Sequence, residues 1–372
     1  MENFVVSARK YRPLGFDEVV GQGHITTTLK NAIDNNHLAQ ALLFCGPRGV
    51  GKTTCARILA KMVNKFDDKG SGESVNSLNI YELDAASNNS VEDIRNLIDQ
   101  VRYPPQQGSF KVYIIDEVHM LSNQAFNAFL KTLEEPPSYA IFILATTEKH
   151  KVIPTILSRC QIFDFNRIEI DDITYQLKKI ASNEGIEAEE EALHLISQKA
   201  DGALRDALSI FDLICTFSSG NKVTYQDTIN NLHILDYDYF FKITNHLYNE
   251  EVSSSLLIYD EILRNGFDGH NFVVGLSEHF RNLMVCKDPE TVKLLNVSKN
   301  IEQKYIEQAK EVNLSFLMSG LNILNQTDLQ YKSSKNQRLH VELALMKLGY
   351  LKQAFTLSAS QDAPVKKKLA TT

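Results

Sequence analysis

The sequence predicts an α/β fold plus all-α domains, with a parallel sheet first and two helical domains after it. Up to about residue 165, apolar strand signals alternate with amphipathic helix signals, the pattern of parallel strands joined by crossover helices. Beyond Phe165 the strand signals vanish and helical periodicity continues. A chain of 372 residues is too long for one core and suits two or three domains.

The elements follow in order along the chain. Strands are predicted at residues 41–44, 79–84, 111–116 and 140–145. Helices are predicted at 91–101, at 123–133, where Pro136 and Pro137 end the pattern, and at 154–157. Further helices are predicted at 174–184, 189–200 and 203–217, and amphipathic segments continue to Gln353. The expected domains are 1–165, 166–235 and 236–355, followed by a disordered tail or linker over 356–372.

Composition excludes several classes of protein. No apolar run approaches the roughly 20 residues of a membrane span, and the N-terminus lacks the regions of a signal peptide, so we expect a cytoplasmic chain without membrane contact. The five cysteines form no C-x-x-C pair, which argues against a disulfide framework and a zinc cluster. Because the net charge is −7, any binding of nucleic acid requires a local basic surface.

A phosphate-binding loop is the strongest chemical signal. The run Gly46, Pro47, Arg48, Gly49, Val50, Gly51, Lys52, Thr53 matches G-x-x-x-x-G-K-[ST], between an apolar strand and a helix that continues from Thr54. Its glycines let several N–H groups point at one phosphate, while Lys52 can reach the β and γ phosphates and Thr53 can hold Mg²⁺. The alternative, a glycine-rich turn with a chance Lys-Thr pair, is disfavoured because such turns rarely bring both flanking elements.

Two acids end the strand at 111–116. Neighbouring parallel strands share one carboxyl edge, so Asp116 is expected beside Thr53 on the same Mg²⁺, with Glu117 orienting or deprotonating the attacking water. The alternative for Glu117 is a favourable interaction with a helix dipole.

Two weaker candidates follow. Thr147 would lie near the γ-phosphate if its strand lies between those that carry the loop and the acids, but threonines also close strand ends. Arg159 ends a short helix and could stabilise the γ-phosphate charge, although an arginine there is more often a solvated surface residue.

Together these residues resemble the gamma/tau subunit family of bacterial DNA polymerase III, the ATPase of the sliding-clamp loader. The resemblance is strong up to about residue 215 and looser in the later helices. It is carried by eight motifs in the same order: ARKYRP (8–13), FDEVVGQ (16–22), the phosphate loop (46–53), DAASNN (84–89), DEVHM (116–120), LKTLEEPP (130–137), ATTE (145–148) and ILSRC (156–160).

The resemblance implies an AAA+ fold with a three-helix lid and a collar domain that closes a five-subunit ring. Arg159 would act as the arginine finger on the ATP of a neighbouring subunit, and Arg205 would be the lid sensor of its own subunit. The alternative for Arg205 is an intrahelical ion pair with Asp201 or Asp206, of which only Asp201 has the i,i+4 spacing. An adenine pocket is implied for Tyr11, Pro13, Val19 and Val20, although a hydrophobic staple explains the two valines almost as well.

The implied function is ATP-driven loading of the sliding clamp onto primed DNA, with Arg95 and Lys131 as candidate DNA contacts. Implied partners are the other clamp-loader subunits, the clamp, primed DNA and, in a longer tau form, the polymerase core. A polymerase classification would describe the complex, since no constellation of acids here suggests nucleotidyl transfer. A branch-migration type of AAA+ motor and a non-hydrolysing scaffold remain as alternatives.

One departure from the family concerns zinc. Family members usually carry four cysteines in the segment that corresponds to residues 64–78, and this sequence has none there. We therefore expect no zinc and a flexible excursion, with Mg²⁺ as the metal of the nucleotide.

Overall fold

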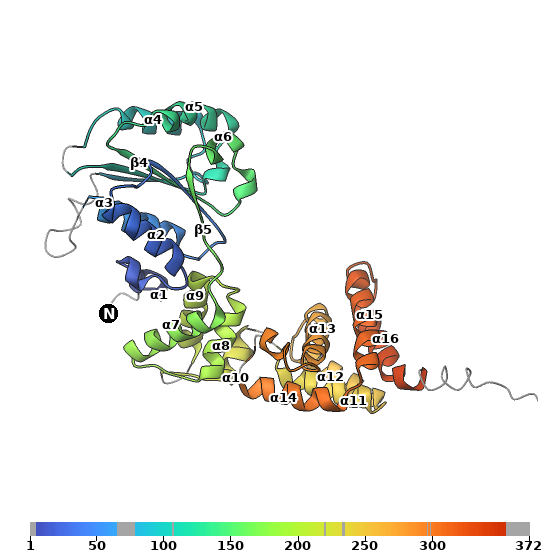
Figure 1. The fold of residues 1–372 in the computed structure, drawn as a ribbon. Coiled ribbons are helices and arrows are strands. Elements are labelled where there is room, and N and C mark those ends of the chain that lie inside the picture. The colour runs from blue at the N-terminus through green and yellow to red at the C-terminus, as the bar shows by residue number, and fades with distance from the viewer. Residues whose placement is uncertain are drawn as a thin grey trace, which may run out of the picture. The chain divides into compact units, whose positions relative to one another are not determined.

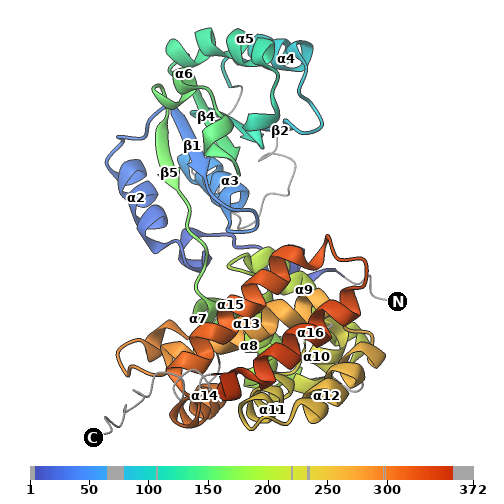
Figure 2. The same cartoon turned by 90° about the vertical axis from the view of Figure 1, so that its right-hand side faces the viewer.

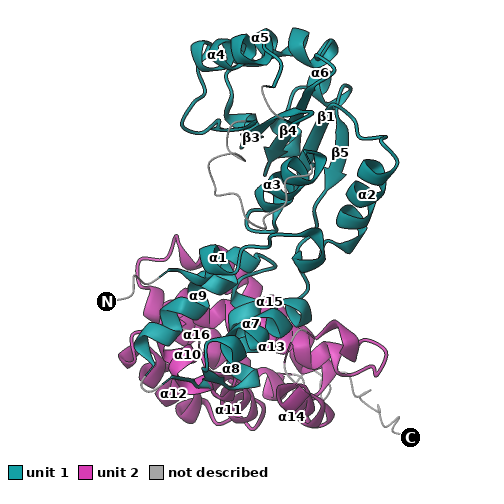
Figure 3. Cartoon of the chain, turned by 90° about the vertical axis from the view of Figure 1, so that its left-hand side faces the viewer, with its two compact units in different colours: residues 1–224 teal, residues 225–372 magenta. Residues whose placement is uncertain are grey.

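The computed structural model describes residues 5–64, 79–105, 108–218, 221–232, 235–295, 297 and 299–354. The chain divides into two compact units, residues 1–224 and 225–372 (Figure 3). The predicted tail at 356–372 lies outside the described residues. The domain boundaries at 165 and 235 stay predictions, because this division does not separate the sheet from the helices that follow it and assigns residues 225–235 to the second unit.

A five-stranded parallel sheet forms the centre of the first unit. The spatial order β2-β3-β4-β1-β5 places β4 between the strand before the phosphate loop and the strand that carries the two acids. Four strands are at the predicted places, whereas β5 was not predicted, because its four residues include only two apolar ones. The strands are β1 (Ala41–Cys45), β2 (Ile80–Asp84), β3 (Lys111–Asp116), β4 (Ala140–Thr146) and β5 (Gln161–Asp164).

Helices cover both faces of this sheet (Figure 1). On one face lie α2 (Gly23–Asp34) and α3 (Lys52–Val63), and on the other lie α4 (Val91–Val101) and α5 (Asn123–Glu134). Successive side chains of a strand point to opposite faces, so alternate apolar residues of β1, β3 and β4 enter two separate cores. Helix α4 has the predicted bounds, and α5 extends one residue further than predicted.

A helical lid follows the sheet within the first unit. It contains α7 (Ile170–Asn183), α8 (Glu190–Lys199) and α9 (Leu204–Phe217), and α1 (Ser7–Lys10) packs against α9. The prediction that strands end near Phe165 is wrong here. β6 (Glu187–Ala188) and β7 (Lys222–Val223) form a small parallel pair, and two-residue strands are too short to produce a periodic signal.

The second unit is helical, as predicted, and has a core of its own. Helices α13, α15 and α16 pack side by side (Figure 2). No helix in the described parts of the chain is long and apolar enough to cross a membrane. The helices are α10 (Tyr225–Leu232), α11 (Tyr237–Tyr248), α12 (Val252–Arg264), α13 (Gly269–Val285), α14 (Lys299–Glu311), α15 (Leu314–Tyr331) and α16 (Gln337–Gly349).

Candidate nucleotide site

The phosphate-loop motif connects the buried strand β1 to the N-terminus of α3. Three of its residues, Gly46, Gly49 and Gly51, have positive φ angles. At Gly46, with φ 147°, a Cβ would lie 2.4 Å from the carbonyl oxygen of Phe165, so only glycine fits without a shift of the backbone. Glycine thus lets the chain curl in front of a helix N-terminus, where backbone N–H groups favour an anion.

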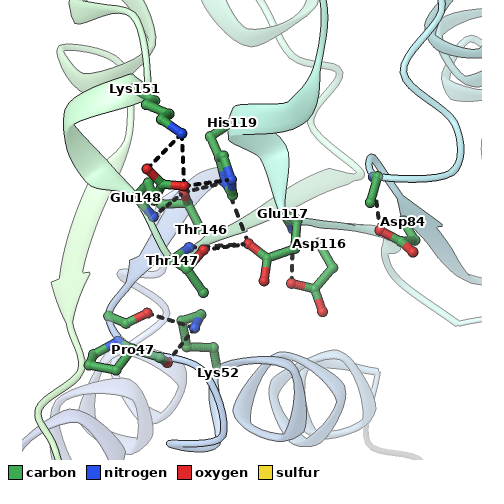
Figure 4. A network of polar contacts seen from close by, with 12 residues as sticks. Pro47, Lys52, Asp84, Asp116, Glu117, His119, Thr146, Thr147, Glu148 and Lys151 are labelled. Atoms are coloured by element: carbon green, nitrogen blue, oxygen red, sulfur yellow. Dashed lines mark hydrogen bonds and ion pairs between the residues drawn. The ribbon is translucent and has the colours of Figure 1, made fainter. Parts of the chain in front are cut away.

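Lys52 is buried at the start of α3, with 6% of its surface exposed. Its Nζ donates hydrogen bonds of 2.7 Å to the carbonyl oxygens of both Gly46 and Pro47 (Figure 4). Burial lowers the pKa of Lys52, while the carboxylates of Glu117 and Asp116 oppose this effect. The loop therefore holds an ammonium group close to two acids.

Thr53 and Asp116 meet at the carboxyl edge of the sheet, as the sequence predicts. The hydroxyl of Thr53 donates a 2.6 Å hydrogen bond to Oδ2 of Asp116, and Oδ1 accepts one from the backbone N–H of Glu117. A hydroxyl and a carboxylate are the hard oxygen ligands that Mg²⁺ prefers. The two side chains therefore fit the predicted metal site.

Glu117 is held by the end of β4. Its Oε2 accepts hydrogen bonds from the backbone N–H and the hydroxyl of Thr147, at 3.2 and 2.9 Å. Its backbone has a φ of 48°, in the left-handed region that non-glycine residues seldom occupy. The sequence predicts Thr147 near the γ-phosphate only if its strand lies between the strand before the loop and the strand with the two acids. β4 does lie between these strands, β1 and β3. No sequence signal predicted that Thr147 would contact Glu117.

One cavity joins the loop to the lid and the N-terminal segment. The four residues predicted to line an adenine pocket, Tyr11, Pro13, Val19 and Val20, all border this cavity. The loop contributes residues 48–54, and Asp116 and Glu117 lie on the wall as well. Five further residues were missed, because only tertiary packing brings them here: Ala8, Arg12, Ile168, Leu204 and Leu208.

Polar contacts fix the N-terminal segment to the lid. The hydroxyl of Tyr11 donates to Glu184, which also accepts a 2.6 Å bond from Lys10. Ser7 donates from its backbone N–H and its hydroxyl to Asp212. Burial, together with Glu184, raises the pKa of Tyr11 to about 12, so its hydroxyl stays protonated. A movement of the lid would therefore move one wall of the cavity.

The surroundings of the cavity are rich in cations. Arg12, Arg48 and Arg205 border it together with Lys52, an arrangement that favours a polyanion. The pKa of Arg12 is lowered by burial and then by the nearby charges of Arg57 and Arg205.

Arg205 is positioned by the loop itself. Its backbone N–H lies 3.4 Å from the carbonyl oxygen of Gly49. Asp201, the alternative partner of Arg205, pairs with Arg167 instead. The side chain of Arg205 therefore does not form the i,i+4 ion pair with Asp201 that the spacing allows as the alternative.

The remaining candidates lie on the surface, outside the residues that line the cavity. Arg159 follows α6 (Pro154–Leu157), where its guanidinium binds the carboxylate of Glu134 and the carbonyl oxygen of Thr155. Arg95 and Lys131 are exposed on the adjacent helices α4 and α5, and Arg95 lies 3.7 Å from Glu92. None of these contacts assigns a function to the three basic residues.

Three family models match the chain in sequence order. Residues 21–169 match the DNA polymerase III delta subunit, residues 172–220 match the ATPase lid domain of the DNA polymerase III clamp loader subunit, and residues 238–348 match the C-terminal domain of the delta subunit. The gamma subunit of DNA polymerase III from Buchnera aphidicola (subsp. Baizongia pistaciae) is 34% identical, over 93% of this chain and 97% of that protein. The chain belongs to the gamma/tau subunit family of DNA polymerase III. Membership of this AAA+ ATPase family implies nucleotide binding.

Other relatives are longer. The tau subunit of DNA polymerase III from Bacillus subtilis is 39% identical over 91% of this chain, but the chain spans only 62% of that protein. Among solved structures, the Holliday junction branch migration motor RuvB of Thermotoga maritima shares 21% identity with a TM-score of 0.48, over 64% of this chain and 79% of that one.

The expectation about zinc stays a prediction. Residues 65–78, most of the segment without cysteine, lie outside the described residues. Within the ranges that the structure describes, no group of three or more His, Cys, Asp or Glu side chains could hold a metal ion.

Proposed function

We propose that this member of the gamma/tau family is the ATPase subunit of the clamp loader, which binds and hydrolyses ATP to load the sliding clamp onto primed DNA. The observation that carries the proposal is the 2.6 Å contact between Thr53 and Asp116, beside buried Lys52 and next to Glu117. A phosphate loop, two metal ligands and a candidate base at one sheet edge are the parts that phosphoryl transfer to water requires.

Each side chain has a proposed task. Lys52 binds the β and γ phosphates, and Glu117 orients or deprotonates the attacking water. Thr53 and Asp116 hold Mg²⁺, which supplies positive charge to the phosphate oxygens. Arg205 detects the γ-phosphate from the lid. The adenine lies against Tyr11, Pro13, Val19 and Val20, which border the same cavity.

The proposed assembly is a five-subunit ring with other clamp-loader subunits. In it Arg159 acts on the ATP of a neighbouring subunit, and Arg95 and Lys131 contact the DNA backbone. A longer tau form would add contacts with the polymerase core, and a polymerase classification would describe the holoenzyme rather than this chain. The proposed location is the cytoplasm, because the proposed substrate is chromosomal DNA. The proposed metal is Mg²⁺, and we expect no zinc.

The decisive experiment is ATP turnover by the assembled ring, with and without clamp and primed DNA. Arg159→Ala should suppress the stimulated turnover by about three orders of magnitude or more and leave nucleotide affinity nearly unchanged, because an arginine finger acts on the transition state. Glu134→Gln is the matched control, since it breaks the ion pair within the chain and keeps Arg159.

Unchanged turnover in Arg159→Ala would refute the role across the interface. A scaffold would bind ATP without turnover even in the wild type, and a branch-migration motor would move DNA junctions without a clamp. The turnover assay therefore separates the ATPase from a scaffold, and a branch-migration assay on a DNA junction without clamp tests the motor.

A further inference from the structure

His119 lies between two carboxylates beside the candidate site. It belongs to the short 3-10 turn η3 (Val118–Met120), which directly follows Glu117, and 6% of its side chain is exposed. Its Nδ1 is 3.4 Å from Oε2 of Glu117, and its Nε2 is 3.5 Å from Oε1 of Glu148. Figure 4 shows the ring between these two acids. An imidazolium in this place can donate to both acids and fix their direction, because each ring nitrogen then carries a proton.

The two oxygens of Glu117 differ in their surroundings. In the described part of the chain, the hydrogen bonds and ion pairs of this carboxylate all go to Oε2, from Thr147 and His119. Oε1 is thereby left for a water molecule. A backbone in the left-handed region costs energy and persists only where neighbouring contacts fix it, and the side-chain contacts of Glu117 are of that kind.

The other side of the imidazole is connected to the surface. Glu148 accepts a 2.9 Å hydrogen bond from Lys151, in the exposed turn η4 (Lys149–Lys151). The backbone N–H of Glu148 donates to the hydroxyl of Thr146, which is 3.1 Å from Nδ1 of His119. Glu148 is therefore held from two sides, and it can in turn hold the ring through Nε2.

We propose that His119 is a positioning residue of the ATPase, with Nδ1 holding Glu117 and Glu148 holding the ring. The inference rests on the proposed hydrolysis of ATP with Glu117 as the base. His119 does not border the cavity, so its contribution is to the rate of hydrolysis and not to nucleotide affinity. Partners that orient a reacting group in this way typically change activity 10- to 100-fold when removed, by analogy with the outer partners of metal ligands.

The test is single-turnover hydrolysis of ATP by the assembled clamp loader with clamp and primed DNA. His119→Ala should lower the rate about 10- to 100-fold, with unchanged affinity for a fluorescent ATP analogue. Because the amide nitrogen of asparagine falls near Nδ1 and that of glutamine near Nε2, His119→Asn should restore most of the rate and His119→Gln little. If His119→Ala does not fold, the comparison of the Asn and Gln variants carries the test.

Two further variants trace the connection to the surface. Glu148→Gln should lower the rate by less than His119→Ala, and the double variant should match His119→Ala, because the two side chains act through one contact. His24→Ala is the control, since His24 is exposed on α2 and does not border the cavity, and it should leave the rate unchanged.

A wild-type rate in His119→Ala, or equal rates in the Asn and Gln variants, would overturn the positioning role. A wild-type complex that fails to hydrolyse ATP would instead overturn the proposed function, so the two failures are distinguishable.

Discussion

Acid should destabilise the second unit through His279, a buried imidazole on α13. Its Nε2 lies 2.9 Å from Oε1 of Gln308, and its Nδ1 lies 3.1 Å from the hydroxyl of Tyr305. The amide nitrogen of Gln308 donates to Asn245 and to the carbonyl of Phe241, so its oxygen acts as the acceptor. Nε2 of His279 therefore carries the proton, and Nδ1 accepts from Tyr305. These contacts satisfy the neutral ring, and a second proton on Nδ1 would require the hydroxyl of Tyr305 to turn from donor to acceptor.

The size of the effect follows from the pKa. Burial lowers the pKa of His279 from 6.5 to about 3, although the hydrogen bond to Gln308 opposes the shift. As the pH falls, the unfolded chain takes up the proton near 6.5, whereas the folded chain takes it up only near 3, so stability decreases across this window. At pH 5, about 1.5 pH units below the ordinary value, the loss is about 2 kcal/mol, since each unit corresponds to about 1.4 kcal/mol.

The assay is urea unfolding of the full chain at pH 7 and pH 5. The sequence has no tryptophan, so Tyr248→Trp on α11 gives a fluorescence signal from the second unit alone. In this background His279→Gln keeps a donor for Gln308 but does not titrate. It should reduce the decrease in unfolding free energy between pH 7 and pH 5 by about 2 kcal/mol. His246→Gln, a half-buried histidine of the same unit, should retain the acid sensitivity. Equal pH dependence with and without His279 would refute the reasoning.

Two other substitutions test the geometry of the candidate site. Gly46→Ala should lower the unfolding temperature of the first unit and weaken ATP binding, because its Cβ would meet the carbonyl of Phe165 at 2.4 Å and strain of this kind costs about 1–3 kcal/mol. Gly23→Ala, where a Cβ meets nothing within 4 Å, should change neither quantity, and equal behaviour of the two variants would contradict the argument. Tyr11→Phe should weaken the binding of a fluorescent ATP analogue about fivefold, as expected for one lost hydrogen bond of about 1 kcal/mol to Glu184. Unaltered affinity would show that this contact with the lid does not shape the cavity.

Local signals account for the parts of the fold that were predicted well. Helix α4 begins where Ser90 and Asp93 form a capping box, and both residues lie within four positions of each other. The buried strands β1, β3 and β4 are short apolar runs, so they could be located without knowledge of their neighbours. By contrast, β5 and the two-residue strands of the lid carry too few residues for a period to be seen.

The sequence by itself determined the phosphate loop and the family, because Gly46 to Thr53 and the other motifs are contiguous runs whose chemistry is readable in place. Only the tertiary structure decided which of the distant candidates meet. It brought Thr147 to Glu117, set His119 between two acids, and added the lid residues Leu204 and Leu208 to the cavity. These contacts join segments that lie up to about 200 residues apart, and they depend on strand order and on the seating of the lid. A local sequence pattern does not contain the strand order or the position of the lid, because both are properties of the packed chain.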